Sequence, residues 1–343
     1  MGKINISVAT DQLISKAKKK IINRGEKVKP SRLEKVIVST VAGDGSHGFL
    51  DGPALTAKFK SPLDVAILPG GTIYVADAFN SSIRKIQDGV VSTFAGNGKA
   101  NVINDIGSKA RFKMPSRLTL DSTGNLYTLD AADPRIRKIT PLCDVSVYAG
   151  SNIFGFKDGC ANTAQFGQSF GIVTDLSGNI FVADSQNDSI RKISSSGEVT
   201  TVAGGNIDPF RCVTGVAINQ QGDLFVSDIC RIKKITRAGI ISTLAGGYFK
   251  GYSNGKGSTA RFSQIEGLVI DKQENIYVTD ENRIRKITPS GVVTTVAGSV
   301  SGYKDGDAAS AKFDGPQGLA LDKDGNIYVA DFNNKRIRKI SFE

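Results

Sequence analysis

A short motif recurs six times in the chain and constrains its fold more than any other feature. The motif is Ile-Arg-Lys-Ile or a close variant, and its copies begin at Ile83, Ile136, Ile190, Ile232, Ile284 and Ile337. Successive copies are 53, 54, 42, 52 and 53 residues apart. One structural unit of roughly fifty residues is therefore repeated, with each copy buried against its neighbours.

Each repeat contains four predicted strands. In the last repeat these are residues 293–298, 318–322, 326–331 and 336–340. The Ile-Tyr-Val-Ala strand is apolar without clean alternation, as expected of a strand that is covered on both faces. The sequence predicts an all-β fold, in which residues 36–343 form a six-bladed β-propeller.

The repeat begins out of phase with the blades. Six copies of the Val-Thr-Thr-Val-Ala-Gly strand precede the six copies of the other three strands, and the chain ends at Glu343 directly after a third strand. This order predicts that residues 38–43 supply the outer strand of the last blade. An N-terminal strand in that position closes the ring and removes an open sheet edge.

Residues 1–35 form a separate basic segment. The chain has a net charge of +11, and this segment holds ten Lys or Arg against three Asp or Glu. Residues 10–24 are predicted to form a short amphipathic helix that Thr10 caps and Gly25 ends, followed by a polar linker. The basic residues of this helix are Lys16, Lys18, Lys19, Lys20 and Arg24. The helix suits a partner's groove, nucleic acid or acidic lipid; alternatively, its apolar side docks on the propeller and the lysines are solvated.

The composition also bears on location and redox chemistry. No stretch approaches the ~18 apolar residues of a membrane span, and the N-terminus lacks the apolar core of a signal peptide. The sequence thus predicts an intracellular, cytoplasmic protein. Its cysteines, Cys143, Cys160, Cys212 and Cys230, show no C-x-x-C spacing. They are expected to be free buried thiols, with a disulfide or a metal near Cys212 and Cys230 as the alternative.

The strand motifs resemble a known repeat. The succession Pro-x-Gly-Leu-Ala-Leu-Asp, Gly-Asn-Ile-Tyr-Val-Ala-Asp and Asn-Lys-Arg-Ile-Arg-Lys-Ile is similar to the NHL repeat, and the resemblance covers the chain from about Val38 onward. It implies a six-bladed propeller that serves as a platform for proteins or RNA, and in some members as an enzyme. The fold by itself does not decide between these functions.

Two rows of charged residues recur in all blades. An Asp ends each second strand, and an Arg or Lys follows in each third strand. The rows are Asp77, Asp130, Asp184, Asp228, Asp280 and Asp331, and Arg84, Arg137, Arg191, Lys233, Arg285 and Arg338. Because every blade carries the pair, we expect a structural role, in which each Asp caps loop amides or pairs with the nearby cation.

Candidate ligand-binding residues lie where the first strands differ. Aligned on Gly318, the strands of blades one and two carry Asp64 and Arg117 in place of the glycine. These positions should ring one mouth of the central channel, with Asp64 and Arg117 as neighbours. The candidate residues at this mouth are Asp64, Arg117, Thr214, Glu266 and Gln317. The alternative is a mouth that is filled by ordinary polar side chains and water.

The connections between blades are the second departure from the repeat. Four enclose 18 residues and one 17, but the connection from Gly204 to Val213 encloses only eight. The long ones carry an Ala-x-Phe anchor that is expected to plug the junction between blades; these residues are Phe59, Phe112, Phe166, Phe262 and Phe313. The connections should share a face with the loops between second and third strands, because the strands of a blade alternate in direction. Candidate recognition residues on this face are Phe79, Asn80, Tyr248, Phe249, Tyr252, Phe332 and Asn333.

Exposed aromatic residues beside Lys and Arg suit a protein groove or stacked RNA bases. The sequence therefore predicts a non-enzymatic scaffold that binds a protein partner through this face, with the basic segment as a second contact. Nucleic-acid binding is the nearest alternative. A calcium-dependent, lactonase-like enzyme is a further alternative, with Asp64, Glu266 and Gln317 as oxygen ligands. The single histidine, His47, cannot form a zinc site of several histidines, and we predict no catalytic residue, metal site or cofactor.

Overall fold

The computed structural model describes residues 35–205 and 210–343. The predicted helix at residues 10–24 and its basic side chains lie outside the described residues. Within those ranges the only helices are four 3-10 turns, η1 (Ala78–Asn80), η2 (Gly107–Lys109), η3 (Ser185–Asn187) and η4 (Gly257–Thr259). None of them is long and apolar enough to cross a membrane.

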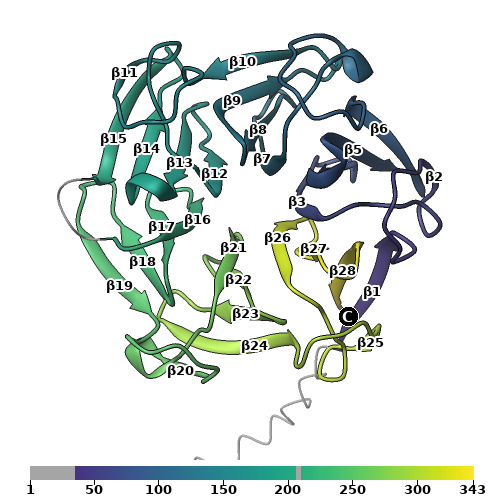
Figure 1. The fold of residues 1–343 in the computed structure, drawn as a ribbon. Coiled ribbons are helices and arrows are strands. Elements are labelled where there is room, and N and C mark those ends of the chain that lie inside the picture. Colours follow the sequence, from purple (N-terminus) through teal and green to yellow (C-terminus); the bar gives the residue numbers. More distant parts are fainter. Residues whose placement is uncertain (1–34, 206–209) are drawn as a thin grey trace, which may run out of the picture. The chain divides into compact units, whose positions relative to one another are not determined.

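Six antiparallel sheets stand in a ring around a central axis (Figure 1), which confirms the predicted all-β six-bladed propeller. We number these sheets as blades one to six along the chain. The innermost strands are β3 (Pro62–Ile67), β7 (Pro115–Leu120), β12 (Gly171–Thr174), β16 (Val213–Ile218), β21 (Ile265–Ile270) and β26 (Pro316–Leu321). The second strands are β4 (Ile73–Asp77), β8 (Leu126–Asp130), β13 (Ile180–Asp184), β17 (Leu224–Asp228), β22 (Ile276–Asp280) and β27 (Ile327–Asp331).

The third and fourth strands complete each blade. The third strands are β5 (Ser82–Gln87), β9 (Asp133–Ile139), β14 (Ser189–Ile193), β18 (Arg231–Ile235), β23 (Arg283–Ile287) and β28 (Arg336–Phe342). The fourth strands are β6 (Val90–Gly96), β10 (Val145–Ala149), β15 (Glu198–Gly204), β19 (Ile241–Ala245), β24 (Val292–Gly298) and, in blade six, β1 (Val36–Ala42). Four blades also carry a two-residue fifth strand, which is β2 (Gly52–Pro53), β11 (Gly159–Cys160), β20 (Gly255–Lys256) or β25 (Gly306–Asp307).

The second strands form the middle of the core. Every residue of β4, β8, β13, β17 and β22 is buried, because each blade packs on a neighbour at either face. This explains why their sequences do not alternate between apolar and polar residues.

The first strand of the chain lies beside the last one (Figure 1). β1 pairs antiparallel with β28, with Val38 opposite Ile340 and Thr40 opposite Arg338. On its other side, β1 pairs with β25. In the other five blades, the fourth strand directly follows the third strand in the chain. In blade six, β1 takes this fourth position instead.

Phenylalanine side chains fill the junctions between blades, as predicted. All five anchor residues are at most 1% exposed. Phe59, for example, packs in one cluster with Ala330 of blade six and Val75 of blade one. The junction of blades three and four has the shortest connection and uses Phe210 instead, which clusters with Ala183 and Val226. The sequence analysis missed Phe210, since no Ala-x-Phe anchor marks it.

The four cysteines are free thiols. Cys230 is buried and Cys143 is half-buried, but Cys160 and Cys212 are exposed. The prediction of buried thiols is therefore wrong for Cys160 and Cys212, which lie on a fifth strand and on the short connection into blade four.

Candidate functional site

The long connections and the loops between second and third strands lie together, as predicted, and we call their common surface the loop-rich face. Asn80 donates from Nδ2 to the carbonyl of Gly48 at 2.7 Å, and Asn187 and Asn334 make the same bond to Gly155 and Gly302 at 2.9 Å. These bonds join the two sets of loops within a blade.

The first strands surround a channel along the propeller axis. All six strands line a cavity of about 340 Å³. A second cavity, of about 440 Å³, lies where these strands begin and is also lined by Ser185 and Gln186 of η3. Four of the five predicted mouth residues, Arg117, Thr214, Glu266 and Gln317, line this second cavity. The mouth therefore opens on the loop-rich face.

Arg117 links several blades across this mouth. Its side chain is buried, and Nε donates to the carbonyl of Phe170 in blade three at 2.9 Å. Nη1 donates to the carbonyl of Leu63 in blade one at 3.3 Å. Nη2 lies 3.7 Å from Oε2 of Glu266 in blade five. The ion pair at the mouth thus joins Arg117 to Glu266, while Asp64, its predicted neighbour, lies close enough for the charge of Arg117 to act on it.

Asp64 lies inside the channel and does not reach the outer cavity. Its carboxylate accepts hydrogen bonds from the amides of Val65 and Leu118 at 2.9 and 2.8 Å. Burial raises the pKa of Asp64 to about 6, although the charge of Arg117 and the two amides act to lower it. Gly318 makes room for Asp64, because a Cβ there would lie 1.8 Å from Oδ1.

The other mouth residues differ in what they offer to a ligand. Thr214 donates from Oγ1 to the carbonyl of Ile265 at 2.8 Å, so its hydroxyl already bridges blades four and five. The carbonyl of Gln317 accepts from Thr279 at 2.8 Å. The partly exposed carboxylate of Glu266 and the side chain of Gln317 are the predicted residues most open to the cavity, and the exposed thiol of Cys212 joins them.

The charged rows have the predicted structural role, which they play within each blade. Asp184, for example, accepts from the amide of Gly167 at 2.9 Å and lies 3.0 Å from Nη1 of Arg191. Ion pairs of this kind form in blades one, three, four, five and six. In blade two, Asp130 binds three backbone amides instead, and burial lowers the pKa of Arg137 to about 10.

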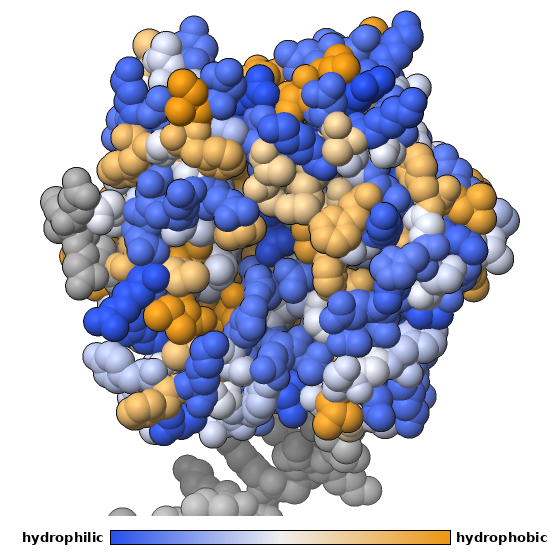
Figure 2. All heavy atoms as spheres, viewed as in Figure 1, coloured by the Kyte–Doolittle hydropathy of each residue, from blue (hydrophilic) through white to orange (hydrophobic). Residues whose placement is uncertain are grey.

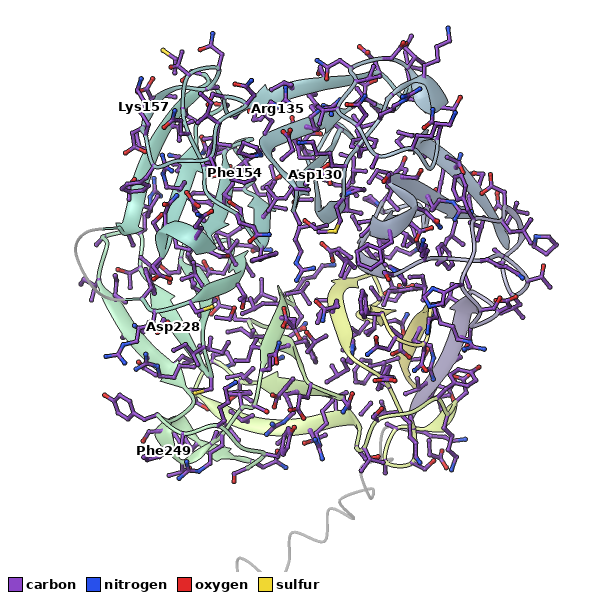
Figure 3. The ribbon with its side chains drawn as sticks, viewed as in Figure 1. Asp130, Arg135, Phe154, Lys157, Asp228 and Phe249 are labelled. Atoms are coloured by element: carbon purple, nitrogen blue, oxygen red, sulfur yellow. The ribbon has the colours of Figure 1, made fainter. Side chains whose placement is uncertain are left out.

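The most exposed aromatic pair of the loop-rich face is Tyr248 and Phe249. Their side chains are 87% and 73% exposed. The guanidinium groups of Arg231 and Arg261 lie over their rings at 5.3 and 5.7 Å. Figure 3 places Phe249 at the periphery of the ring, away from the channel. Figure 2 shows that hydrophobic side chains form separate patches among hydrophilic ones around a central hollow.

Other candidate residues of this face have structural partners. Phe79 is 53% exposed on η1, whereas Phe332 is only half-exposed. Asn333 is exposed and donates to Asp314 at 3.2 Å. Asn80 is buried, because its amide binds Asp77 and Gly48. Its proposal as a recognition residue is therefore wrong.

Tyr252 belongs to a set of four partly exposed aromatic residues that lie against arginines of the third strands. Three of these arginines are buried, but Arg283 beside Tyr252 is only half-buried. Arg283 lies over its ring at 4.1 Å. Phe49, Phe156 and Tyr303 cover Arg84, Arg191 and Arg338 at 4.8, 4.8 and 4.9 Å. The sequence analysis did not single out Phe156 or Tyr303. A signal was present, since each of the four precedes by two residues the Asp or Asn of an Asp-Gly or Asn-Gly turn.

No metal-ligand cluster supports the calcium alternative. Within residues 35–205 and 210–343, no three His, Cys, Asp or Glu side chains come close enough together to hold a metal ion. Asp64 and Glu266 are each committed to other partners, namely backbone amides and Arg117.

Comparison with known sequences shows related propellers within larger proteins. Residues 313–340 match the NHL repeat. The chain is 27% identical over 318 residues to the chloroplastic protein Suppressor of Quenching 1 of Arabidopsis thaliana, covering 88% of the chain and 27% of that protein. It is 25% identical over 368 residues to Teneurin-3 of Mus musculus, covering 89% of the chain and 13% of that protein. The chain thus spans about a quarter or less of these relatives.

Solved structures that share this fold include a binding protein and an enzyme. An auxiliary nutrient binding protein from Bacteroides thetaiotaomicron aligns with a TM-score of 0.71 at 18% identity, over 90% of this chain and 77% of that one. A gluconolactonase from Xanthomonas campestris aligns with a TM-score of 0.61 at 9% identity, over 89% of each chain. At these identities the likeness establishes the fold alone. The chain is a six-bladed β-propeller whose last blade carries an NHL repeat.

Proposed function

We propose that the propeller is a non-enzymatic interaction platform that binds a protein partner through its loop-rich face. The observation that carries the proposal is the adjacent pair Tyr248 and Phe249. Both rings are exposed, and each lies under an arginine. Aromatic and arginine side chains dominate the binding energy of protein interfaces. The nutrient binding protein of the same fold is consistent with a binding role.

The geometry gives less support to an enzyme. A catalytic carboxyl has to reach its substrate, but both oxygens of Asp64 accept backbone hydrogen bonds inside the channel. Arg117 is likewise held by carbonyls of blades one and three. We therefore assign Asp64 and Arg117 the structural role of joining neighbouring blades. The outer cavity remains a secondary candidate site for a small ligand, because Glu266 and Gln317 face it.

The test replaces Tyr248 and Phe249 together by Ala in the full chain. The partner is first identified by chemical cross-linking and mass spectrometry with the unaltered protein, and its affinity is then measured by calorimetry. We expect the double variant to lose at least tenfold in affinity, because interface hot spots contribute about 2 kcal/mol or more each. Phe79→Ala should produce a smaller loss, since its ring has no stacked arginine among the described residues.

A matched control removes equally exposed apolar side chains from the opposite face. Leu142 and Leu176 are each 85% exposed in hairpins at the other end of the strands. Their double alanine variant should bind like the unaltered protein. Equal binding by both double variants would contradict the proposal. An affinity for RNA that falls steeply with salt would favour the nucleic-acid alternative, and removal of residues 1–35 would show whether the basic segment carries it.

A further inference from the structure

One long connection of the loop-rich face carries positive charge without any negative charge. The connection from Gly246 to Ile265, which leads from blade four into blade five, contains Lys250, Lys256 and Arg261 and no Asp or Glu. Each of the other four long connections contains at least one Asp. A ligand that contacts this connection therefore meets cations alone among its charged side chains.

Two arginines of the third strands lie against the aromatic residues of this connection. Arg231 begins β18 and Arg283 begins β23, and their guanidinium groups lie over the rings of Tyr248 and Tyr252 at 5.3 and 4.1 Å. Arg261 of the connection itself lies over the ring of Phe249 at 5.7 Å. We call this set the basic aromatic patch, which consists of Arg231, Tyr248, Phe249, Lys250, Tyr252, Arg261 and Arg283.

Backbone hydrogen bonds hold the patch in a defined shape. The amide of Arg261 donates to the carbonyl of Ser253 at 3.0 Å, and the amide of Gly251 donates to the carbonyl of Phe262 at 3.1 Å. Gly251 also leaves room for the side chain of Arg261, because a Cβ there would lie 3.2 Å from its Cδ. A surface that is organised before binding loses less conformational entropy when a partner docks.

The buried arginine of blade five adds to the positive charge beside the patch. Nη1 of Arg285 lies 2.7 Å from Oδ2 of Asp280, and its Nη2 donates to the side-chain oxygen of Asn254 at 3.0 Å. In blades one, three and six, the corresponding arginine pairs with a second carboxylate, which is Asp51, Asp158 or Asp305. Because Asn254 is neutral, blade five has one negative charge fewer at this place.

Two carboxylates near the patch do not cancel its charge. Asp228 is buried, and it lies 2.8 Å from Nη2 of Arg231 and 3.0 Å from the ammonium of Lys233. Glu281 is exposed and accepts from the hydroxyl of Ser263 at 2.8 Å. The four cations of the patch outnumber these two carboxylates, so the patch attracts anions.

The positive charge does not continue into the next connection. The connection from Gly298 to Pro316 contains two lysines against three acidic residues, which are Asp305, Asp307 and Asp314. A nucleic-acid strand binds along an extended basic surface. A basic surface that is limited to one connection matches a short acidic segment of a protein better.

We infer that the basic aromatic patch binds a short acidic segment of the partner protein. The inference rests on the proposed function, because it assigns the chemistry of that partner. Carboxylates of the segment accept from Arg261 and Arg283, since a guanidinium that stacks on a ring keeps its N–H donors around its edge. An apolar side chain of the segment lies on the exposed rings of Tyr248 and Phe249. Charge complementarity of this kind supplies specificity and speeds association.

The test uses the full chain and a fluorescent peptide, Gly-Glu-Asp-Leu-Asp-Glu-Phe-Gly, which combines carboxylates with two apolar side chains. A matched neutral peptide carries Gln and Asn in place of Glu and Asp. Fluorescence anisotropy at low salt should show saturable binding of the acidic peptide, at least about tenfold tighter than binding of the neutral one. NMR should show side-chain shifts at Arg261 and Arg283. Equal binding of the two peptides, or no binding of the acidic one, would overturn the inference.

Charge reversal separates recognition from folding. Arg261→Glu combined with Arg283→Glu should lose the acidic peptide and gain binding of a peptide that carries Lys in place of Glu and Asp. Misfolding cannot produce such a gain. The matched control, Lys304→Glu combined with Lys312→Glu, changes the net charge equally on the next connection and should leave the affinity for the acidic peptide within about twofold. An equal loss in the control would show that overall charge attracts the peptide, and would overturn the inference.

The outcomes also distinguish this inference from the proposed function. If the reversed variant keeps the natural partner while Tyr248→Ala combined with Phe249→Ala loses it, only the acidic segment is refuted. If the double alanine variant keeps the partner as well, the proposed function itself fails. A single-stranded RNA that binds the patch more tightly than the acidic peptide at physiological salt would assign the patch to nucleic acid and overturn the inference.

Discussion

The buried arginines of the third strands show how single residues hold this molecule together. Arg191 is fully buried, and its charge is balanced by Asp184 on one side and Asp158 on the other. Its remaining donors bind the carbonyls of Gln165 and Lys157 at 3.0 and 2.9 Å. A buried guanidinium is costly unless it is paired and hydrogen-bonded, so each blade surrounds its cation with acceptors and aromatic rings.

In blades one, three and six, an Asp of the entering connection accepts from a Thr of the fourth strand and pairs with the Arg of the third strand. In blade five, Asn254 takes the place of this Asp, and this difference gives a stability prediction. Asn254→Asp should raise the free energy of unfolding by about 1 kcal/mol, because a hydrogen bond to a charged group contributes more than one between neutral groups. Urea denaturation checks this value. The converse change, Asp158→Asn, should lower the stability by a similar amount; a stabilising effect of that change would contradict the reasoning.

The raised pKa of Asp64 predicts a pH dependence of stability. The unfolded carboxyl has a pKa near 3.8 and the folded one a pKa of about 6, so the folded state binds the proton more tightly. The cost of ionising Asp64 is therefore absent below about pH 4, grows as the pH rises and is complete above about pH 6. Relative to the unaltered protein, Asp64→Asn should gain on the order of 2 kcal/mol in stability between pH 4 and pH 7.

Urea denaturation at both pH values measures this relative gain. Other buried carboxyls with raised pKa values, such as Asp331, cancel in the comparison of the two proteins. A carboxyl-carbon NMR titration of Asp64 provides an independent check. A midpoint near 4 would show that the channel does not perturb this group.

At the scale of elements, the pairing of β1 with β28 joins the two ends of the described propeller. The amide of Lys35 donates to the carbonyl of Glu343 at 2.9 Å, and the amide of Glu343 donates back to Lys35 at 2.8 Å. Val38 packs with Phe313 and Ile340 in the core of blade six. Because β1 is far from β28 in sequence, this contact forms only when the other blades are in place, and its formation carries a loop-closure cost.

Placing a charge in β1 tests the contribution of this strand. Val38→Asp should lower the free energy of unfolding by about 3 kcal/mol or more, because it buries an unpaired carboxylate. Ser39→Asp is the matched control, since the neighbouring side chain is exposed, and it should change stability by less than about 0.5 kcal/mol. Chemical denaturation measures both values. Equal effects of the two changes would mean that Val38 is not packed against β28.

At the scale of the whole molecule, the six blades are alike in their cores and unequal at their rims. The long connections of blades one, three, five and six cover the outer edges, whereas the part of blade four that the structure describes ends at β19. A less covered sheet edge should open more readily than the covered edges of the other blades. Amide hydrogen exchange reports such local opening.

Amide hydrogen exchange across the ring tests this inequality. The amide of Thr243 should exchange roughly 10 to 100 times faster than that of Thr201, which donates a hydrogen bond to Asp158. Exchange followed by NMR in the full chain provides the comparison, with the equivalent amides of Thr40 and Thr93 as references. Equal protection of Thr243 and Thr201 would show that another segment covers blade four.

The sequence by itself determined the number of blades, the order of strands and the residues of the core. These follow from the six-fold motif, because the hydrogen bonds within a blade join strands that are close in the chain, and each kind of strand recurs in every repeat. The anchor phenylalanines and the pairs of Asp with Arg could also be predicted, since they recur at the same place in each repeat. The basic segment at residues 1–35 remains a prediction.

Only the tertiary structure decided what depends on contacts between distant repeats. Arg117 pairs with Glu266 and not with Asp64 because the ring brings blade five across the channel from blade two. Asn80 is buried because the connection before β3 folds over it. The position of β19 at the end of the described sheet of blade four likewise became visible only when the covered edges of the other blades could be compared with it. Such contacts are fixed by the closure of the ring, and no local pattern in the sequence encodes them.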